Sequence, residues 1–203
     1  MMVVWHHALI QVPGTTDFIP LSAWGWGHLG VDLFFMISGF IMVHTTWGKP
    51  VTPWQFISNR IRRIVPLYWT ATLAMIGLAL VLPSQFRSLR FDAVSVVKSL
   101  GFVPFYSLSD PGVVFPVLKP GWTLNYEMFF YLLFALSMLL ARRWRVPSMV
   151  ALLGCLVGLG YLYAPTNAIL SVYTGPKLIE FGFGMVIARW WLARTVVSKS
   201  TGG

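Results

Sequence analysis

Long apolar segments restrict the fold of this chain more than any other feature. The five longest run roughly over residues 30–47, 64–82, 122–140, 147–163 and 176–192. A helix needs about 17 to 25 mainly apolar residues to cross the hydrocarbon core of a membrane. Hydrophobic residues make up 57% of the chain and charged residues only 10%, against about 25% charged in ordinary globular domains. The sequence therefore predicts an all-α, polytopic transmembrane helical bundle.

Two further segments complete the predicted organisation of residues 1–203 as a single membrane domain. Residues 1–12 are apolar but too short for a full span, so we expect a partial first helix and about six spans in all. The N-terminus lacks the positive region and the cleavage site of a signal peptide. Residues 83–121 form a long connection whose apolar middle is short and interrupted by a glycine and a proline. We expect this connection to be extracytoplasmic, interfacial or re-entrant.

The basic residues predict the orientation of the bundle. The chain carries 15 Lys and Arg against 6 Asp and Glu, but these cations lie between apolar segments rather than in one patch, so no nucleic-acid partner is expected. Cytoplasmic connections of membrane proteins are enriched in Lys and Arg. The connections that follow the segments 30–47, 122–140 and 176–192 are therefore predicted to be cytoplasmic. Their basic residues are, in this order, Lys49, Arg60, Arg62 and Arg63; Arg142, Arg143 and Arg145; and Arg189, Arg194 and Lys199.

Ionisable side chains inside apolar segments mark a candidate functional site. A carboxylate at the bilayer centre costs roughly 3 kcal/mol, so such residues normally face a cavity or a partner. With 1.5 Å of rise per residue, the predicted topology brings four of them to one layer in the outer half of the membrane: His7, Asp32, Glu127 and Glu180. His6 is adjacent to His7, and only one of the two can face a cavity because neighbours on a helix diverge by about 100°.

A histidine beside a carboxylate is suited to general base catalysis, since the acid orients the imidazole and stabilises the imidazolium. His7 with Asp32 or Glu127 is such a pair, although a histidine at this depth can also bind a backbone carbonyl or face water. Thr123 and Tyr131 lie four residues either side of Glu127 and share its helical face. Together they predict a polar stripe directed into the protein.

The sequence N-R-I-R-R-I-V-P places Arg60, Arg62 and Arg63 in a dense basic turn. Such clusters often only set topology and contact anionic lipid headgroups. The alternative is a phosphate site, because guanidinium groups bind phosphate oxygens in bidentate geometry. On the predicted topology these arginines lie across a core about 30 Å thick from the layer of His7 and the acids.

Several other chemistries have no sequence support. No G-x-S-x-G, H-E-x-x-H, P-loop or C-x-x-C motif occurs, so we expect neither a metal site nor a permanently bound cofactor. The lone Cys155 lies in an apolar segment and is expected to serve packing.

Five motifs in order resemble the membrane acyltransferase 3 family, and above all its branch that O-acetylates exopolysaccharides and O-antigens. They are V-V-W-H-H-A at the start, G-V-D-L-F-F-M-I-S-G-F-I-M, N-R-I-R-R-I-V-P-L-Y-W, P-G-W-T-L-N-Y-E-M-F-F-Y and L-I-E-F-G-F-G-M. The resemblance implies a multi-pass protein of the bacterial inner membrane. It also implies transfer of an acyl group, usually acetyl, from acyl-CoA to a hydroxyl of a polysaccharide or lipid-linked glycan.

The resemblance also assigns residues. The family histidine maps to His7, the cytoplasmic R-x-x-R motif maps to Arg60 and Arg63, and the acids map to Asp32 and Glu127. We expect Arg60 and Arg63 to hold phosphates of coenzyme A. We add supporting roles for Tyr131, Glu180 and Asn125.

The family has about ten helices and an arginine eleven residues before its histidine, so the sequence predicts a partial domain. Two other interpretations remain open at this point: a transporter or flippase whose buried acids move protons or substrate, and a catalytically inactive fragment. If transfer occurs, the donor arm must thread the bundle, or an acyl-histidine must relay the acyl group.

Overall fold

The structure, a computed structural model, describes residues 21–200, with side chains described for residues 29–194. This part of the chain is helical, with an isolated β-bridge between Tyr106 and Val114 and no named strand. The predicted all-α fold is confirmed. The chain divides into two compact units, one formed by residues 1–45 with 180–203 and the other by residues 46–179.

The first unit contains two long helices, α2 (Leu21–Thr46) and most of α8 (Leu178–Ser200). They cross at glycines, because a Cβ on Gly39 would overlap the backbone carbonyl of Phe181 and a Cβ on Gly184 would overlap that of Met36. The Phe35 ring lies 4.8 Å from the Phe181 ring beside this crossing. Small residues that let two backbones approach closely are typical of helix pairs in membranes.

The second unit is built on α3 (Pro53–Val81), which is 29 residues long. Thr52 caps its N-terminus in a capping box with Gln55, and Pro53 occupies the first turn. The sequence T-P-W-Q carries this signal, since Ser or Thr followed three residues later by Glu or Gln starts helices. The predicted span began only at residue 64, so the prediction was wrong about the start of this helix. As a consequence, Arg60, Arg62 and Arg63 lie inside α3 and not in a turn before it.

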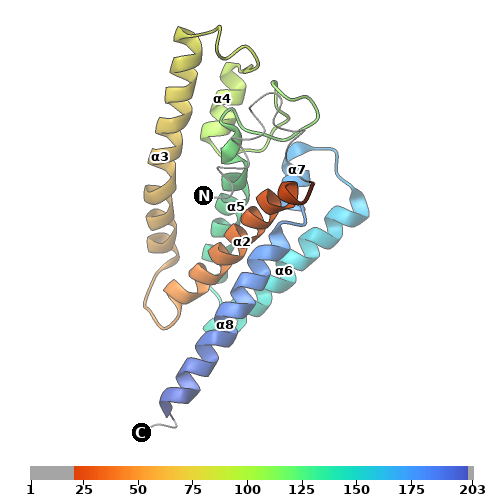
Figure 1. The fold of residues 1–203 in the computed structure, drawn as a ribbon. Coiled ribbons are helices and arrows are strands. Elements are labelled where there is room, and N and C mark those ends of the chain that lie inside the picture. The colour runs from red at the N-terminus through yellow and green to blue at the C-terminus, as the bar shows by residue number, and fades with distance from the viewer. Residues whose placement is uncertain (1–20, 201–203) are drawn as a thin grey trace. The chain divides into compact units, whose positions relative to one another are not determined.

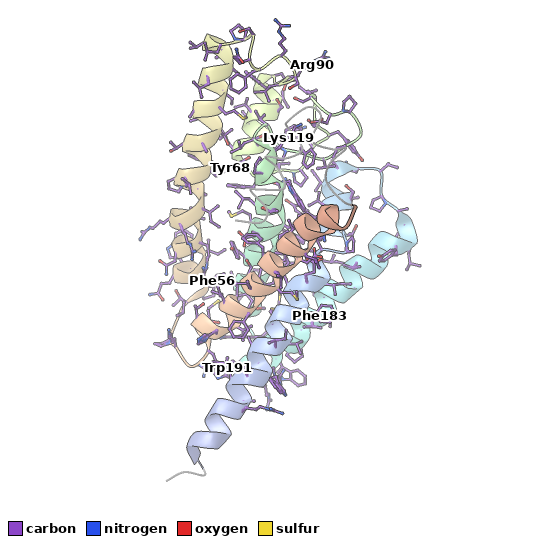
Figure 2. All side chains as sticks on the ribbon, in the orientation of Figure 1. Phe56, Tyr68, Arg90, Lys119, Phe183 and Trp191 are labelled. Carbon is purple, nitrogen blue, oxygen red and sulfur yellow. The ribbon has the colours of Figure 1, made fainter. Side chains whose placement is uncertain are left out.

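Helix α5 (Trp122–Ser137) runs antiparallel to α3, as Figure 1 shows. Near the start of α3, the Phe56 ring lies 5.2 Å from the Phe134 ring near the end of α5. Near the middle of α3, the Tyr68 ring fills the space where a side chain at Gly121 would lie. These contacts fix the register: α5 begins beside the middle of α3 and ends beside its first turns. Figure 2 labels Phe56 and Tyr68 along α3.

The connection over residues 83–121 folds back along the second half of α3. It contains α4 (Ala93–Leu100), capped by Asp92, and the short 3-10 helix η1 (Lys119–Gly121). The indole nitrogen of Trp69 donates to the Leu100 carbonyl at 2.9 Å, and the Phe102 ring lies 5.0 Å from the Tyr68 ring. Phe102 adopts a left-handed backbone, φ +56. This connection therefore reaches the middle of α3.

The second unit is completed by α6 (Arg142–Tyr163) and the short α7 (Ala168–Tyr173). Asn167 caps α7, accepting from the backbone nitrogen of Ile169 at 2.9 Å. The Phe129 ring of α5 stacks on the Tyr173 ring of α7 at 4.2 Å. The sequence did not predict α7, because it is too short to show a hydrophobic period.

Three described helical segments have the length and hydropathy of a membrane span: Leu29–Thr46, Pro53–Val81 and Arg142–Tyr163. They correspond to three of the predicted spans. The segment predicted over residues 122–140 forms a helix of only 16 residues, which extends about 24 Å and does not cover a core about 30 Å thick. The predicted partial first helix lies outside the described residues.

Candidate functional site

Arg60 is the centre of the candidate site, and three side chains from α3 and α5 surround its guanidinium group. Its guanidinium carbon lies 5.4 Å from the centre of the Phe56 ring and 5.8 Å from the centre of the Tyr131 ring. Glu127 interacts electrostatically with Arg60, and the Tyr131 hydroxyl forms a side-chain hydrogen bond with the Glu127 carboxylate. We call Phe56, Arg60, Glu127 and Tyr131 the arginine cluster. It brings together three residues that the sequence had singled out.

The spacing along the two helices explains this geometry. Phe56 and Arg60 are four residues apart on α3, and Glu127 and Tyr131 are four apart on α5, so each pair shares one helical face. The antiparallel register places these faces opposite each other. Phe56, Glu127 and Tyr131 are buried, with 3%, 4% and 4% of their surfaces exposed. Of the polar stripe predicted around Glu127, the side chains of Glu127 and Tyr131 are thus directed into the protein.

The predicted separation between the arginines and Glu127 is wrong. The predicted topology puts Trp122 at the outer surface and Glu127 five residues, or about 8 Å, below it, with Arg60 on the opposite side of the core. In the structure α5 begins beside Tyr68, in the middle of α3. Glu127 and Tyr131 therefore lie beside the first half of α3, where they reach Arg60. The error arose because the path of residues 83–121 along α3 leaves no periodic signal in the sequence.

Arg60, together with Arg63 one turn further along α3, offers guanidinium groups for a ligand. The Nε atom of Arg60 is buried and lacks a hydrogen-bond partner among the described residues. Arg63 is exposed on the same helix, as is Arg62. An unsatisfied guanidinium donor beside a second, accessible guanidinium is suited to a phosphate group, because phosphate oxygens accept paired N–H groups.

Asn125 lies in α5 and is buried, with 3% of its surface exposed. It is two residues from Glu127, so it faces a different direction around the helix. Asn125 therefore shares α5 with Glu127 and Tyr131 but does not share their helical face.

Asp32 and Glu180 belong to the first unit and lie at one end of its helix crossing. Met36 of α2 lies against Gly184 of α8. Asp32 is one turn before Met36, and Glu180 is one turn before Gly184. Both acids are partly buried. The apolar segment starting near residue 30 predicts Asp32 at the start of its helix, which is wrong because the described helix α2 already includes Leu21. His6 and His7 lie outside the described residues.

Sequence reasoning missed a second polar group beside the α3–α5 contact. The Tyr68 hydroxyl faces the hydroxyls of Thr72 and Ser99, and Ser99 Oγ accepts a hydrogen bond from the backbone nitrogen of Val117 at 2.8 Å. All four residues are buried. The i, i+4 spacing of Tyr68 and Thr72 was a signal that the sequence offered. The partners Ser99 and Val117 come from a connection without periodicity, so the sequence did not reveal them.

Span-length helices and a polar cluster buried between helices define a multi-pass helical membrane protein. The family model described as "Acyltransferase domain", for the acyltransferase 3 family, matches residues 1–200. The chain belongs to the acyltransferase 3 family, which confirms the resemblance drawn from its motifs.

Characterised relatives agree with this membership. The chain is 44% identical over 176 residues to the exopolysaccharide production protein ExoZ of Rhizobium meliloti (strain 1021), covering 87% of this chain and 55% of that protein. It is 32% identical over 173 residues to the peptidoglycan O-acetyltransferase OatA of Listeria monocytogenes, covering 77% of this chain and 27% of that protein. The chain thus spans about half or less of the length of these relatives. No solved structure matches it.

Proposed function

We propose that this chain forms part of a membrane O-acyltransferase that moves an acyl group, usually acetyl, from acyl-CoA to a hydroxyl of a bacterial surface or exported polysaccharide. Membership of the acyltransferase 3 family supports the reaction class. The names of the relatives, an exopolysaccharide production protein and a peptidoglycan O-acetyltransferase, support a polymeric sugar as acceptor. The protein acts in the bacterial inner membrane, where a cytoplasmic donor and an exported glycan are both accessible.

The observation that carries this proposal is the buried Nε of Arg60, which has no hydrogen-bond partner within the described part of the chain, close to the exposed Arg63 on the same helix. In the proposed mechanism these two guanidinium groups hold phosphates of coenzyme A. His7 removes the proton from the acceptor hydroxyl, and the oxygen attacks the thioester carbonyl. An ester C–O bond forms, the C–S bond breaks, and the proton passes to the departing thiolate. Asp32 stabilises the imidazolium, because Glu127 already interacts with Arg60.

Two variants in cells test the acyl-transfer step. His7→Ala should abolish acetylation of the glycan while export of the glycan continues, because only the base is lost. Retained acetylation would remove His7 from this role. Loss of export with normal acetylation of the remaining glycan would favour a transporter or flippase.

The donor site has a matched control on its own helix. Arg63→Ala should raise the KM for acetyl-CoA about tenfold, the usual consequence of losing a charged hydrogen bond. Arg62→Ala removes a neighbouring charge that is also exposed, and it should change the KM much less. Equal effects of the two substitutions would indicate a diffuse electrostatic attraction in place of a defined phosphate site.

A further inference from the structure

The arginine cluster couples two helices through one partly buried guanidinium. Arg60 comes from α3, whereas Glu127 and Tyr131 come from α5, more than sixty positions later in the chain. A cation between helices is costly unless a carboxylate or an aromatic face compensates it. Arg60 has both, because the Phe56 and Tyr131 rings and the Glu127 carboxylate all lie around it.

These contacts restrict the orientation of the guanidinium. The ring of Tyr131 approaches it at 5.8 Å, while the hydroxyl of Tyr131 is engaged by Glu127. Glu127 therefore acts on Arg60 both directly, through its charge, and indirectly, by holding the tyrosine ring. An arginine side chain has many rotamers, and fixing one of them in advance lowers the entropy cost of binding a ligand.

We propose that Glu127 and Tyr131 are positioning residues for Arg60 and that α5 thereby sets the geometry of the donor phosphate site on α3. This inference rests on the proposed function, in which Arg60 contacts coenzyme A. Under this proposal Glu127 contributes to binding of the acyl-CoA donor. Another acid then stabilises the imidazolium of the catalytic histidine.

The sign of one substitution separates this role from its alternative. An acid that merely lies near a phosphate site repels the phosphates, so its removal tightens donor binding. An acid that holds the binding arginine in place has the opposite effect, and its removal weakens donor binding. Glu127→Ala therefore gives opposite results under the two interpretations.

The test measures the Kd of coenzyme A for the intact detergent-purified protein by titration calorimetry. We expect Glu127→Ala to raise the Kd about tenfold in the presence of Arg60, as for a lost charged hydrogen bond. In an Arg60→Ala background the same substitution should leave the Kd unchanged or lower it, because no guanidinium remains to be positioned. A lower Kd in the otherwise unchanged protein, or equal weakening in both backgrounds, would overturn the proposal.

Tyr131→Phe isolates the hydroxyl, because it keeps the ring over the guanidinium and loses only the bond to Glu127. We expect a Kd between those of the unchanged protein and Glu127→Ala. The matched control is Tyr161→Phe, whose side chain is 75% exposed on α6 and which should not change the Kd. An unchanged Kd for Tyr131→Phe would remove Tyr131 from the positioning role.

A second measurement distinguishes failure of this inference from failure of the donor site itself. If Arg60→Ala and Arg63→Ala both leave coenzyme A binding unchanged, the proposed donor site is wrong. The positioning contact is then judged by a double-mutant cycle of Arg60→Ala and Glu127→Ala on the unfolding of the protein in detergent. Non-additive effects support the contact, and additive effects overturn it.

Discussion

The guanidinium carbon of Arg60 lies 5.8 Å from the centre of the Tyr131 ring, although the two residues belong to different helices and the sequence predicts Arg60 and the nearby Glu127 on opposite sides of the membrane core. This contact exists because α5 begins beside the middle of α3 and not at its end. A basic motif near the start of one apolar segment and an acidic motif in another thus form one cluster. Four further relationships in the structure give predictions that stability measurements in detergent can check.

The helix crossing in the first unit requires glycine at two positions. Gly39→Ala and Gly184→Ala each introduce a Cβ that overlaps a backbone carbonyl, of Phe181 and Met36 respectively. A backbone cannot rotate away as a side chain can, so the helices must separate, and we expect each substitution to destabilise the protein by about 1–3 kcal/mol. Thermal unfolding measures this effect.

The control for these glycines is Gly154→Ala on α6, where a Cβ would have no neighbour within 4 Å. Alanine is the better helix former by up to about 1 kcal/mol, so this variant should be unchanged or slightly more stable. Equal destabilisation by all three substitutions would show that close helix contact is not the cause.

Ser99 anchors the folded-back connection to α3. Its Oγ accepts a hydrogen bond from the buried backbone nitrogen of Val117 at 2.8 Å. Ser99→Ala leaves that nitrogen buried and unsatisfied, which costs about 1–3 kcal/mol. The exposed Ser88→Ala should have no comparable effect. Hydrogen exchange at Val117 offers a local readout, and unchanged protection there would contradict the assigned bond.

Asp92 should make the stability of α4 depend on pH. The backbone N–H of Ser95 donates to Asp92 Oδ1 at 2.7 Å, and this bond, with that to the Ser95 hydroxyl, lowers the pKa of Asp92. A lowered pKa in the folded state means that the contribution is present above the unfolded pKa of about 3.9 and is lost as the pH falls through the folded value. Asp92→Asn should therefore be less stable than the unchanged protein at neutral pH.

The stability difference caused by Asp92→Asn should disappear when the pH is lowered well below 4, because Asp92 is then protonated in both states. Unfolding midpoints measured across this range provide the check. A difference that stays constant with pH would exclude the charged cap as its source.

Phe56 should contribute more to the stability of the second unit than its position near the start of α3 suggests. Its ring contacts Phe134 at 5.2 Å and lies under the guanidinium of Arg60. Phe56→Ala should destabilise the protein by about 3–5 kcal/mol, the usual cost of truncating a buried phenylalanine. Trp54→Ala, at a side chain that is 75% exposed, is the comparison and should cost far less. Similar losses would mean that Phe56 acts through helix formation and not through packing.

The apolar segments and motifs of the sequence determined the all-helical fold, the membrane environment and the family. These properties follow from local composition and from the cost of placing polar groups in hydrocarbon, which each segment expresses by itself. The sequence also selected Arg60, Glu127 and Tyr131 as functional candidates, because ionisable groups in apolar helices need partners. The capping box at Thr52 and Gln55 was visible in the sequence as well and would have corrected the start of α3.

Only the tertiary structure decided which of these residues meet. Depth along a helix depends on where its neighbours begin, and residues 83–121 fold back beside α3 through non-periodic contacts such as that of Trp69 with Leu100. That path lowers the start of α5 to the level of Tyr68 and so brings Glu127 and Tyr131 to Arg60. The sequence specified which residues could join the arginine cluster, but long-range packing set the register of α5 along α3. A helix in a membrane can take several positions along its axis until its neighbours fix one of them.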